Sequence, residues 1–286
     1  MTSHPVILIL LGHYLPGYKS GGPLRSIVNL VNSLSDEFDF RILCADRDFG
    51  DTEPYRGITP GQWGPVGRAW VYYTPPASQM LSWLARIIRE TPHDLLYLNS
   101  FFSLQSTIIP LIARRSGLIP RRPLVIAPRG EFSPGAIALK RMKKRTYIAL
   151  AKATGLLSDT IWQASSKHEV ADIRTVLGRS AHAIRVAMDL PAPLPPSPHQ
   201  HMSRAPDDPL RAIFLSRISP KKNLDYALRV LAGVKAPVLF SIYGPAEDAA
   251  YLSECKKLAE QLPPHITVNW RGAVDPANVP RVMAEH

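Results

Sequence analysis

Cysteine is scarce in this sequence, and its placement argues against a metal site. Cys44 and Cys255 are the only cysteines among 286 residues, and they stand far apart. Neither has a Cys or His neighbour at the spacing of metal ligands. We therefore expect two buried, reduced thiols, Cys44 in a strand and Cys255 on the apolar face of a helix, as is typical of a cytosolic protein.

Long hydrophobic runs are also missing. No stretch approaches the roughly 20 apolar residues that are needed to cross a bilayer. The longest apolar start, residues 6–11, is too short for the hydrophobic part of a secretory signal, and no basic segment precedes it. We expect a cytoplasmic protein that either stays free or lies peripherally against the inner face of the membrane.

Acidic residues are few compared with basic ones. The 34 Lys and Arg residues exceed the 23 Asp and Glu residues by 11. That excess indicates an anionic partner, which could be nucleic acid, a membrane surface or a phosphorylated metabolite. No signature of a nucleic-acid module and no aromatic residues interleaved through a basic stripe are present, so we expect no nucleic-acid partner.

Two common phosphate-binding motifs are absent. Gly17 and Gly22 have the spacing of a P-loop, but Pro23 and Leu24 follow in place of Lys and Ser or Thr, and no GxGxxG occurs. A nucleoside triphosphatase and a nicotinamide dehydrogenase are both disfavoured. Gly21 and Gly22 nevertheless open a predicted helix, where backbone can approach a ligand closely. The alternative is a glycine turn that feeds a helix without binding anything.

Apolar runs and helical periodicity alternate through the first two thirds of the chain. Residues 5–11 form a continuous apolar run that is typical of a strand covered on both faces. Residues 46–68 show no periodicity and predict a long loop, either a functional excursion or a lid. Further strands are predicted at residues 38–45, 69–74, 94–98, 124–127, 160–164 and 183–186, and helices at 24–34, 80–89, 104–115 and 167–177.

A proline-rich segment then predicts a domain boundary. Residues 190–209 contain seven prolines, which support neither a helix nor a central strand, so we expect an extended linker. His199 and His201 lie inside it without a third ligand and are interpreted as solvated residues. The predicted domains are residues 1–189 and 210–286.

The stretch LRAIFLSRISPKKNLDYALRVL, residues 210–231, predicts a strand, a short loop and a helix. Arg217 and Lys222 then lie at the carboxyl end of a strand and the amino end of a helix, where open α/β sheets bind ligands. An Arg fork, a Lys ammonium and a helix dipole together suit a diphosphate. The alternative is a solvated basic turn. With strands at 238–243 and 266–270 and helices at 248–262 and 278–285, we predict an α/β fold of two Rossmann-like, doubly wound domains.

Two other stretches carry candidate functional residues. In PRGEFSPG, Arg129 and Glu131 follow a strand and are either acceptor or sugar contacts or a local ion pair. The run KRMKKR places five cations on a predicted helix, and it suits an anionic membrane surface, although a solvated helix face and non-specific polyanion binding are alternatives. The five cations are Lys140, Arg141, Lys143, Lys144 and Arg145.

Three blocks in order, SGGPLRSIVNLVNSL, PRGEFSPGAIALKRMKKR and SRISPKKNLDYAL, resemble bacterial group 1 (family 4) retaining glycosyltransferases of the GT-B fold. The resemblance implies sugar transfer from a nucleotide-diphosphate donor to a hydroxyl of a glycan or lipid-linked acceptor, in cell-surface polysaccharide synthesis. It places the family's RxxxxK pattern on Arg217 and Lys222 as catalytic cations, and its donor loop on Gly21 and Gly22. Gly244, after the next strand, is a further donor-binding candidate. No cofactor or metal ion is expected.

The sequence departs from the family at three places. Asn99 stands where members often have His and is a candidate sugar contact, and Asn223 replaces a Gly but also accepts left-handed backbone. The family's acidic ExxxxxxxE motif, which holds the donor's ribose and sugar, would lie downstream of residue 286. We therefore expect a family member cut within its second domain, or alternatively a nucleotide-sugar-binding remnant without activity.

Overall fold

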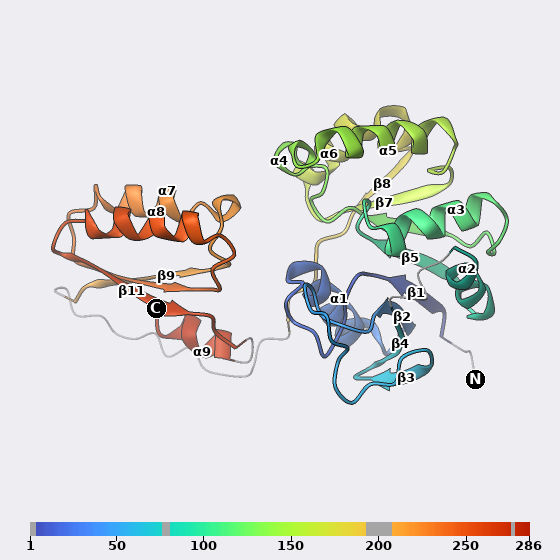
Figure 1. Ribbon diagram of the computed structural model, residues 1–286, viewed down its shortest axis with the longest axis horizontal. Helices are drawn as coiled ribbons and strands as arrows, with labels where there is room; N and C mark the ends of the chain where they lie inside the picture. The colour runs from blue at the N-terminus through green and yellow to red at the C-terminus, as the bar shows by residue number, and fades with distance from the viewer. Residues whose placement is uncertain (1–3, 76–80, 193–207, 276–277) are drawn as a thin grey trace. The chain divides into compact units, whose positions relative to one another are not determined.

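The computed structural model describes residues 4–75, 81–192, 208–275 and 278–286. The chain divides into two compact units, Met1–Pro193 and Leu194–His286 (Figure 1). The division falls inside the segment 190–209 that the sequence predicts to be a linker. Most of that segment, His199 and His201 included, lies outside the described residues, so its interpretation as a linker stays a prediction.

The first unit is built on a sheet of eight strands in the order β3-β4-β2-β1-β5-β6-β7-β8. The strands are β1 (Val6–Leu10), β2 (Asp39–Ala45), β3 (Trp63–Val66), β4 (Ala69–Thr74), β5 (Leu95–Asn99), β6 (Leu124–Ala127), β7 (Thr160–Ala164) and β8 (Ala183–Val186). Every pair is parallel except β3 with β4. Because the strand order reverses between β1 and β5, the carboxyl ends of these two strands border the crevice in which such sheets bind ligands.

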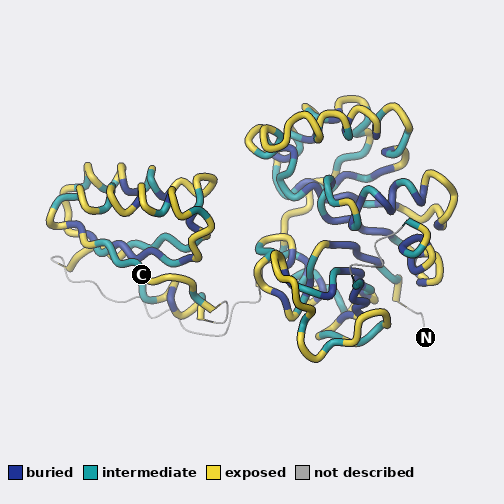
Figure 2. The backbone as a smooth tube through the Cα atoms, viewed as in Figure 1, coloured by how far each residue is buried: buried dark blue, intermediate teal, exposed yellow. Residues whose placement is uncertain are grey.

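Helices cover both faces of this sheet. Leu8 and Leu10 belong to one hydrophobic cluster with Leu84, whereas Ile9 belongs to another with Ile27. The alternation explains why the first strand has a continuous apolar run, and the buried strands are dark in Figure 2. The helices are α1 (Gly22–Leu34), α2 (Leu81–Glu90), a π turn (Leu104–Ile108) leading into α3 (Ile109–Arg115), α4 (Pro134–Ala138), α5 (Arg141–Ala153) and α6 (Lys167–Leu177).

One strand was not expected from the sequence. Residues 46–68 were predicted to be loop throughout, but β3 forms within them and pairs antiparallel with β4. Its four residues include Gly64 and Pro65, which disfavour strands and hide any alternation. Proline is tolerated here because β3 is the edge of the sheet and needs no ladder on its outer side.

The second unit repeats the strand-loop-helix pattern on a parallel sheet ordered β11-β10-β9. Its elements are β9 (Leu210–Leu215), a 3-10 turn (Pro220–Lys222), α7 (Leu224–Leu231), β10 (Val238–Tyr243), α8 (Ala249–Glu260), β11 (Ile266–Gly272) and α9 (Val279–Ala284). Leu224 and Leu228 of α7 pack with Cys255 of α8 against the strands. The predicted strand, loop and helix over residues 210–231 are confirmed, as is the predicted α/β fold class with two Rossmann-like units.

Both cysteines are buried and free, Cys44 in β2 and Cys255 in α8, as predicted. Burial raises the pKa of each thiol above its ordinary value. The described parts of the chain contain no helix that is long and apolar enough to cross a membrane.

Candidate functional site

The glycine loop ends at the first turn of α1. Gly21 is the N-cap of this helix and has φ 71° and ψ −134°, a conformation that a residue with a side chain rarely adopts. Gly22 and Pro23 then form the first turn, where no side chain caps the helix. Pro23 has no backbone N–H, so the groups available to an anion are the N–H groups of Gly22 and Leu24, and the helix dipole favours an anion there.

A buried carboxylate braces this loop. Oδ2 of Asp48 accepts hydrogen bonds from the backbone N–H groups of Tyr18 (2.7 Å) and Lys19 (3.1 Å), and Oδ1 accepts from Phe49 (2.8 Å). Burial alone raises the pKa of Asp48, but the three N–H donors outweigh burial and lower it below the ordinary value. Asp48, near the start of the long segment 46–68, thus holds the glycine loop in place. Sequence reasoning missed Asp48, because nothing in a stretch without periodicity marks it.

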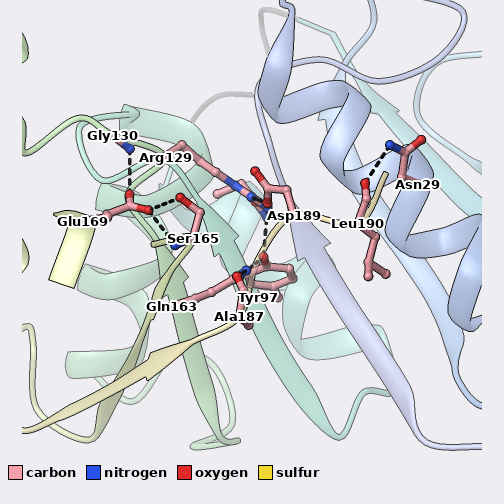
Figure 3. Close-up of polar contacts among 11 residues, drawn as sticks. Asn29, Tyr97, Arg129, Gly130, Gln163, Ser165, Glu169, Ala187, Asp189 and Leu190 are labelled. Atoms are coloured by element: carbon pink, nitrogen blue, oxygen red, sulfur yellow. Dashed lines mark hydrogen bonds and ion pairs between the residues drawn. The ribbon is translucent and has the colours of Figure 1, made fainter. Parts of the chain in front are cut away.

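A cluster of polar side chains lies at the carboxyl ends of β5 and β6. Arg129, at φ 55°, directs Nε (3.1 Å) and Nη2 (2.8 Å) to Oδ1 of Asn99, and Nη2 also reaches the hydroxyl oxygen of Tyr97 at 2.9 Å. Its Nη1 pairs with Asp189, which follows β8 (Figure 3). The structure therefore brings the two predicted sugar-contact residues, Asn99 and Arg129, together at the reversal of strand order.

Glu131 is directed elsewhere. Its carboxylate accepts from Ser100 Oγ at 2.6 Å and from the backbone N–H groups of Phe101 (2.5 Å) and Phe102 (3.2 Å). The local ion pair with Arg129 that the sequence left open does not form. Glu131 holds the turn after β5 in place, and its predicted contact with a sugar stays a prediction.

In the second unit, Arg217 and Lys222 flank the loop after β9. Nη1 of Arg217 lies 2.6 Å from Oε1 of Glu247, and both side chains are partly exposed, at 47% and 41%. Lys222 is exposed and has no acidic partner among the described residues. Asn223 has φ 53° and ψ 40°, the left-handed conformation expected of it.

Gly244 holds this loop against the one that follows β10. A Cβ atom at Gly244 would lie 1.8 Å from the backbone oxygen of Ser216, a separation that no side chain permits. The N–H of Ile218 donates to the oxygen of Pro245 at 2.9 Å, and the N–H of Glu247 donates to the oxygen of Ile218 at 3.2 Å. Gly244 thus has a packing reason to be glycine, and its contact with a donor stays a prediction.

The basic run begins just before α5. Lys144 does not share the solvent face, because its Nζ donates to the oxygen of Ala136 at 2.6 Å and lies 4.7 Å from the centre of the Phe102 ring. The other four cations are exposed and form no ion pairs within the described chain, and the exposed apolar side chains Leu139 and Met142 lie among them. Lys140 precedes the helix, whose first residue is Arg141.

No group of three or more His, Cys, Asp or Glu side chains in the described chain is arranged to hold a metal ion.

Comparisons with solved structures show the predicted GT-B fold, with its Rossmann-like α/β units. No protein-family model matches the chain, and no curated protein matches it. Among solved structures, Anabaena HepE in complex with UDP and glucose aligns over 98% of this chain and 72% of its own, with a TM-score of 0.62 and 18% identity. HepE in complex with UDP aligns over 98% of this chain and 71% of its own, with a TM-score of 0.61 and 16% identity. An E. coli trehalose-6-phosphate protein bound with UDP-2-fluoro glucose aligns over 97% of this chain and 76% of its own, with a TM-score of 0.57 and 10% identity.

Proposed function

We propose that this protein transfers a sugar from a nucleotide-diphosphate donor to a hydroxyl acceptor. The likeness to HepE, bound to UDP and glucose, supports the proposal because it extends over 98% of this chain. Within that shared fold, each unit offers groups that favour an anion at the carboxyl edge of its sheet. They are the uncapped first turn of α1 in one unit, and Arg217 with Lys222 in the other.

Charge stabilisation explains how these residues would act. Negative charge grows on the leaving diphosphate as the sugar–phosphate bond breaks, and fixed cations at that position lower the barrier. Arg217 can offer a planar fork to the phosphate oxygens, and Lys222 can add a point charge. Loss of one such group should raise the barrier by about 3 kcal/mol, which is roughly a hundredfold in rate. No metal ion is required in this proposal.

The finer parts of the proposal concern the product and the acceptor. We infer retention at the anomeric carbon, and a glycan or lipid-linked acceptor used in cell-surface polysaccharide synthesis, from the three sequence blocks described above. Proton NMR of the product distinguishes retention from inversion, because the two anomers have different couplings.

Donor binding is tested by calorimetry with UDP- and GDP-sugars on the intact chain. Arg217→Ala and Lys222→Ala should each weaken donor binding about tenfold, as expected for loss of a charge-assisted contact. Lys221→Ala is the matched control, since this exposed lysine stands in the same turn, and its affinity should stay within about twofold of wild type. Equal affinity in all three variants would contradict the proposal. Donor binding without turnover would favour the alternative of an inactive binding remnant.

The exposed basic face of α5 supports a second partner, an anionic membrane surface. Lys140, Arg141, Lys143 and Arg145 lie beside the exposed apolar side chains of Leu139 and Met142. Cations around an apolar anchor are typical of segments that lie in the interface of anionic bilayers. A lipid-linked acceptor would be reached from this position.

A further inference from the structure

The segment that follows β8 is tied to the first unit by side chains from a strand, a helix and the turn after β6. Nε2 of Gln163, on β7, donates to the oxygen of Ala187 at 3.0 Å, and Nδ2 of Asn29, on α1, donates to the oxygen of Leu190 at 2.8 Å. Between them, Asp189 pairs with Arg129 (Figure 3). We call residues 187–190 the strap. It runs along the carboxyl edge of the sheet from β7 to α1, across the reversal of strand order where ligands bind.

Arg129 is a fixed cation beneath the strap. Its side chain is 9% exposed and is held by Asn99 and Tyr97, and Gln163 in turn accepts a hydrogen bond from the Tyr97 hydroxyl. Burial raises the pKa of Tyr97, so this phenol stays a neutral hydrogen-bonding partner. The guanidinium therefore cannot leave its place without breaking several contacts.

The anion on Arg129 is held less firmly. The Asp189 side chain is 40% exposed, so its carboxylate can return to water at little expense. Two other carboxylates close to the turn that carries Arg129 are already engaged. Glu131 is held by the turn after β5, and Glu169 accepts from the N–H of Gly130 and from Ser165, each at 2.7 Å. Arg129 thus combines a fixed cation with an exchangeable counterion.

Asn99 provides a second, independent sign of a ligand. It is 2% exposed, and its Nδ2 has no hydrogen-bond partner among the described residues. The orientation of the amide is set, because Oδ1 accepts two N–H groups from Arg129. Buried donors are rarely left unpaired, and one beside a guanidinium indicates a missing acceptor oxygen.

We propose that Arg129 and Asn99 form an anion subsite that Asp189 fills when substrate is absent. The acceptor then carries an anionic group, a phosphate or a carboxylate, that displaces Asp189 and gives Asn99 Nδ2 its acceptor oxygen. The planar guanidinium suits either group, because both can accept two parallel N–H bonds. The identification of the ligand as the acceptor rests on the function proposed above. The existence of the anion subsite does not depend on that function.

A double-mutant cycle on the intact chain tests this subsite, with inorganic phosphate and glucuronate titrated separately at constant ionic strength. Asp189→Asn removes the internal competitor and should bind at least one of the two anions about tenfold more tightly than wild type. Arg129→Gln alone should bind neither anion more tightly than wild type, and Asp189→Asn combined with Arg129→Gln should show no gain over Arg129→Gln. The two titrations show whether the subsite prefers phosphate or carboxylate. Asp36→Asn is the matched control, because it frees the exposed Arg68 from its partner and should give no such gain.

A measurement on wild type covers the case in which Asp189→Asn does not fold. The Ala187 amide of the strap donates to the oxygen of Ala164 at 2.9 Å. Saturating anion should speed hydrogen exchange at this amide, since the strap loses one of its ties, and Arg129→Gln should not respond. An unchanged affinity in Asp189→Asn, a gain that survives Arg129→Gln, or strap exchange insensitive to anion would each overturn the proposal. Titration of UDP-glucose separates the two claims, because donor binding involves Arg217 and Lys222 and does not require this subsite.

Discussion

Nη1 of Arg217 lies 2.6 Å from Oε1 of Glu247, so the cation proposed to bind the donor diphosphate already has a carboxylate beside it. Both side chains are partly exposed, and such a pair contributes little to folding. The carboxylate instead competes with any diphosphate for the guanidinium.

Removing that carboxylate should therefore favour the donor. We expect Glu247→Gln to bind UDP- or GDP-sugars about two- to fivefold more tightly than wild type, the range of an exposed ion pair worth up to about 1 kcal/mol. Calorimetry measures the change, and Glu254→Gln, an exposed carboxylate on α8, should have no effect. Weaker binding in Glu247→Gln would show that Glu247 assists the donor.

Gly244→Ala should destabilise the second unit. The new methyl group would overlap the backbone oxygen of Ser216, and relieving the overlap has to move the loop that carries Arg217. We expect a loss of about 2 kcal/mol or more in the free energy of unfolding, measured with urea. Gly233→Ala is the control, since its Cβ would lie at an ordinary 3.6 Å from the nearest atom. Equal unfolding curves for the two variants would contradict the packing assigned to Gly244.

Asp48 should make stability depend on pH. Because its folded pKa is lowered, its contribution is fully present above the unfolded value of about 3.9 and is lost as pH falls towards the folded value. At pH 7, Asp48→Asn should lose about 1–3 kcal/mol of unfolding free energy, since a neutral amide cannot replace all three contacts. The difference from wild type should shrink below about pH 4. Asp51→Asn, which removes an exposed ion pair with Lys19, should change the free energy of unfolding little at pH 7 or below pH 4. A loss of stability in Asp48→Asn that is the same at both pH values would contradict the role given to the Asp48 carboxylate.

The basic face of α5 should bind anionic vesicles. We expect co-sedimentation with phosphatidylglycerol vesicles but not with phosphatidylcholine vesicles, weakening as salt rises. Changing Lys140, Arg141, Lys143 and Arg145 to Gln should abolish it, and Met142→Ser should weaken it. The control changes four exposed cations elsewhere to Gln, namely Arg174, Arg179, Lys235 and Lys257. Equal losses in both sets would indicate a response to net charge alone.

The sequence predicts the parts of this fold that are local. The continuous apolar run predicts β1, and the order of apolar and polar residues predicts the strand, loop and helix around Arg217; both patterns lie within a few residues. The left-handed conformation at Asn223 is likewise a property of one residue and its neighbours. These features could be read without knowledge of the tertiary structure.

The contacts that define the candidate sites depend on distant segments. Asp48 meets the glycine loop 30 residues away, and Asp189 meets Arg129 across 60 residues, through the path that the chain takes after β8. Lys144 leaves the basic face because Phe102, on another loop, lies beneath it. No periodicity or motif predicts these long-range contacts, because they form only when the sheet assembles.

Release of nucleoside diphosphate from a UDP- or GDP-sugar, followed with and without glycan acceptors, tests the proposed transfer most directly. Wild type should turn over a donor, and Arg217→Ala should lower kcat about a hundredfold while its circular dichroism and unfolding curve stay unchanged. Turnover at the wild-type rate in Arg217→Ala would contradict the assignment of this cation to the leaving diphosphate.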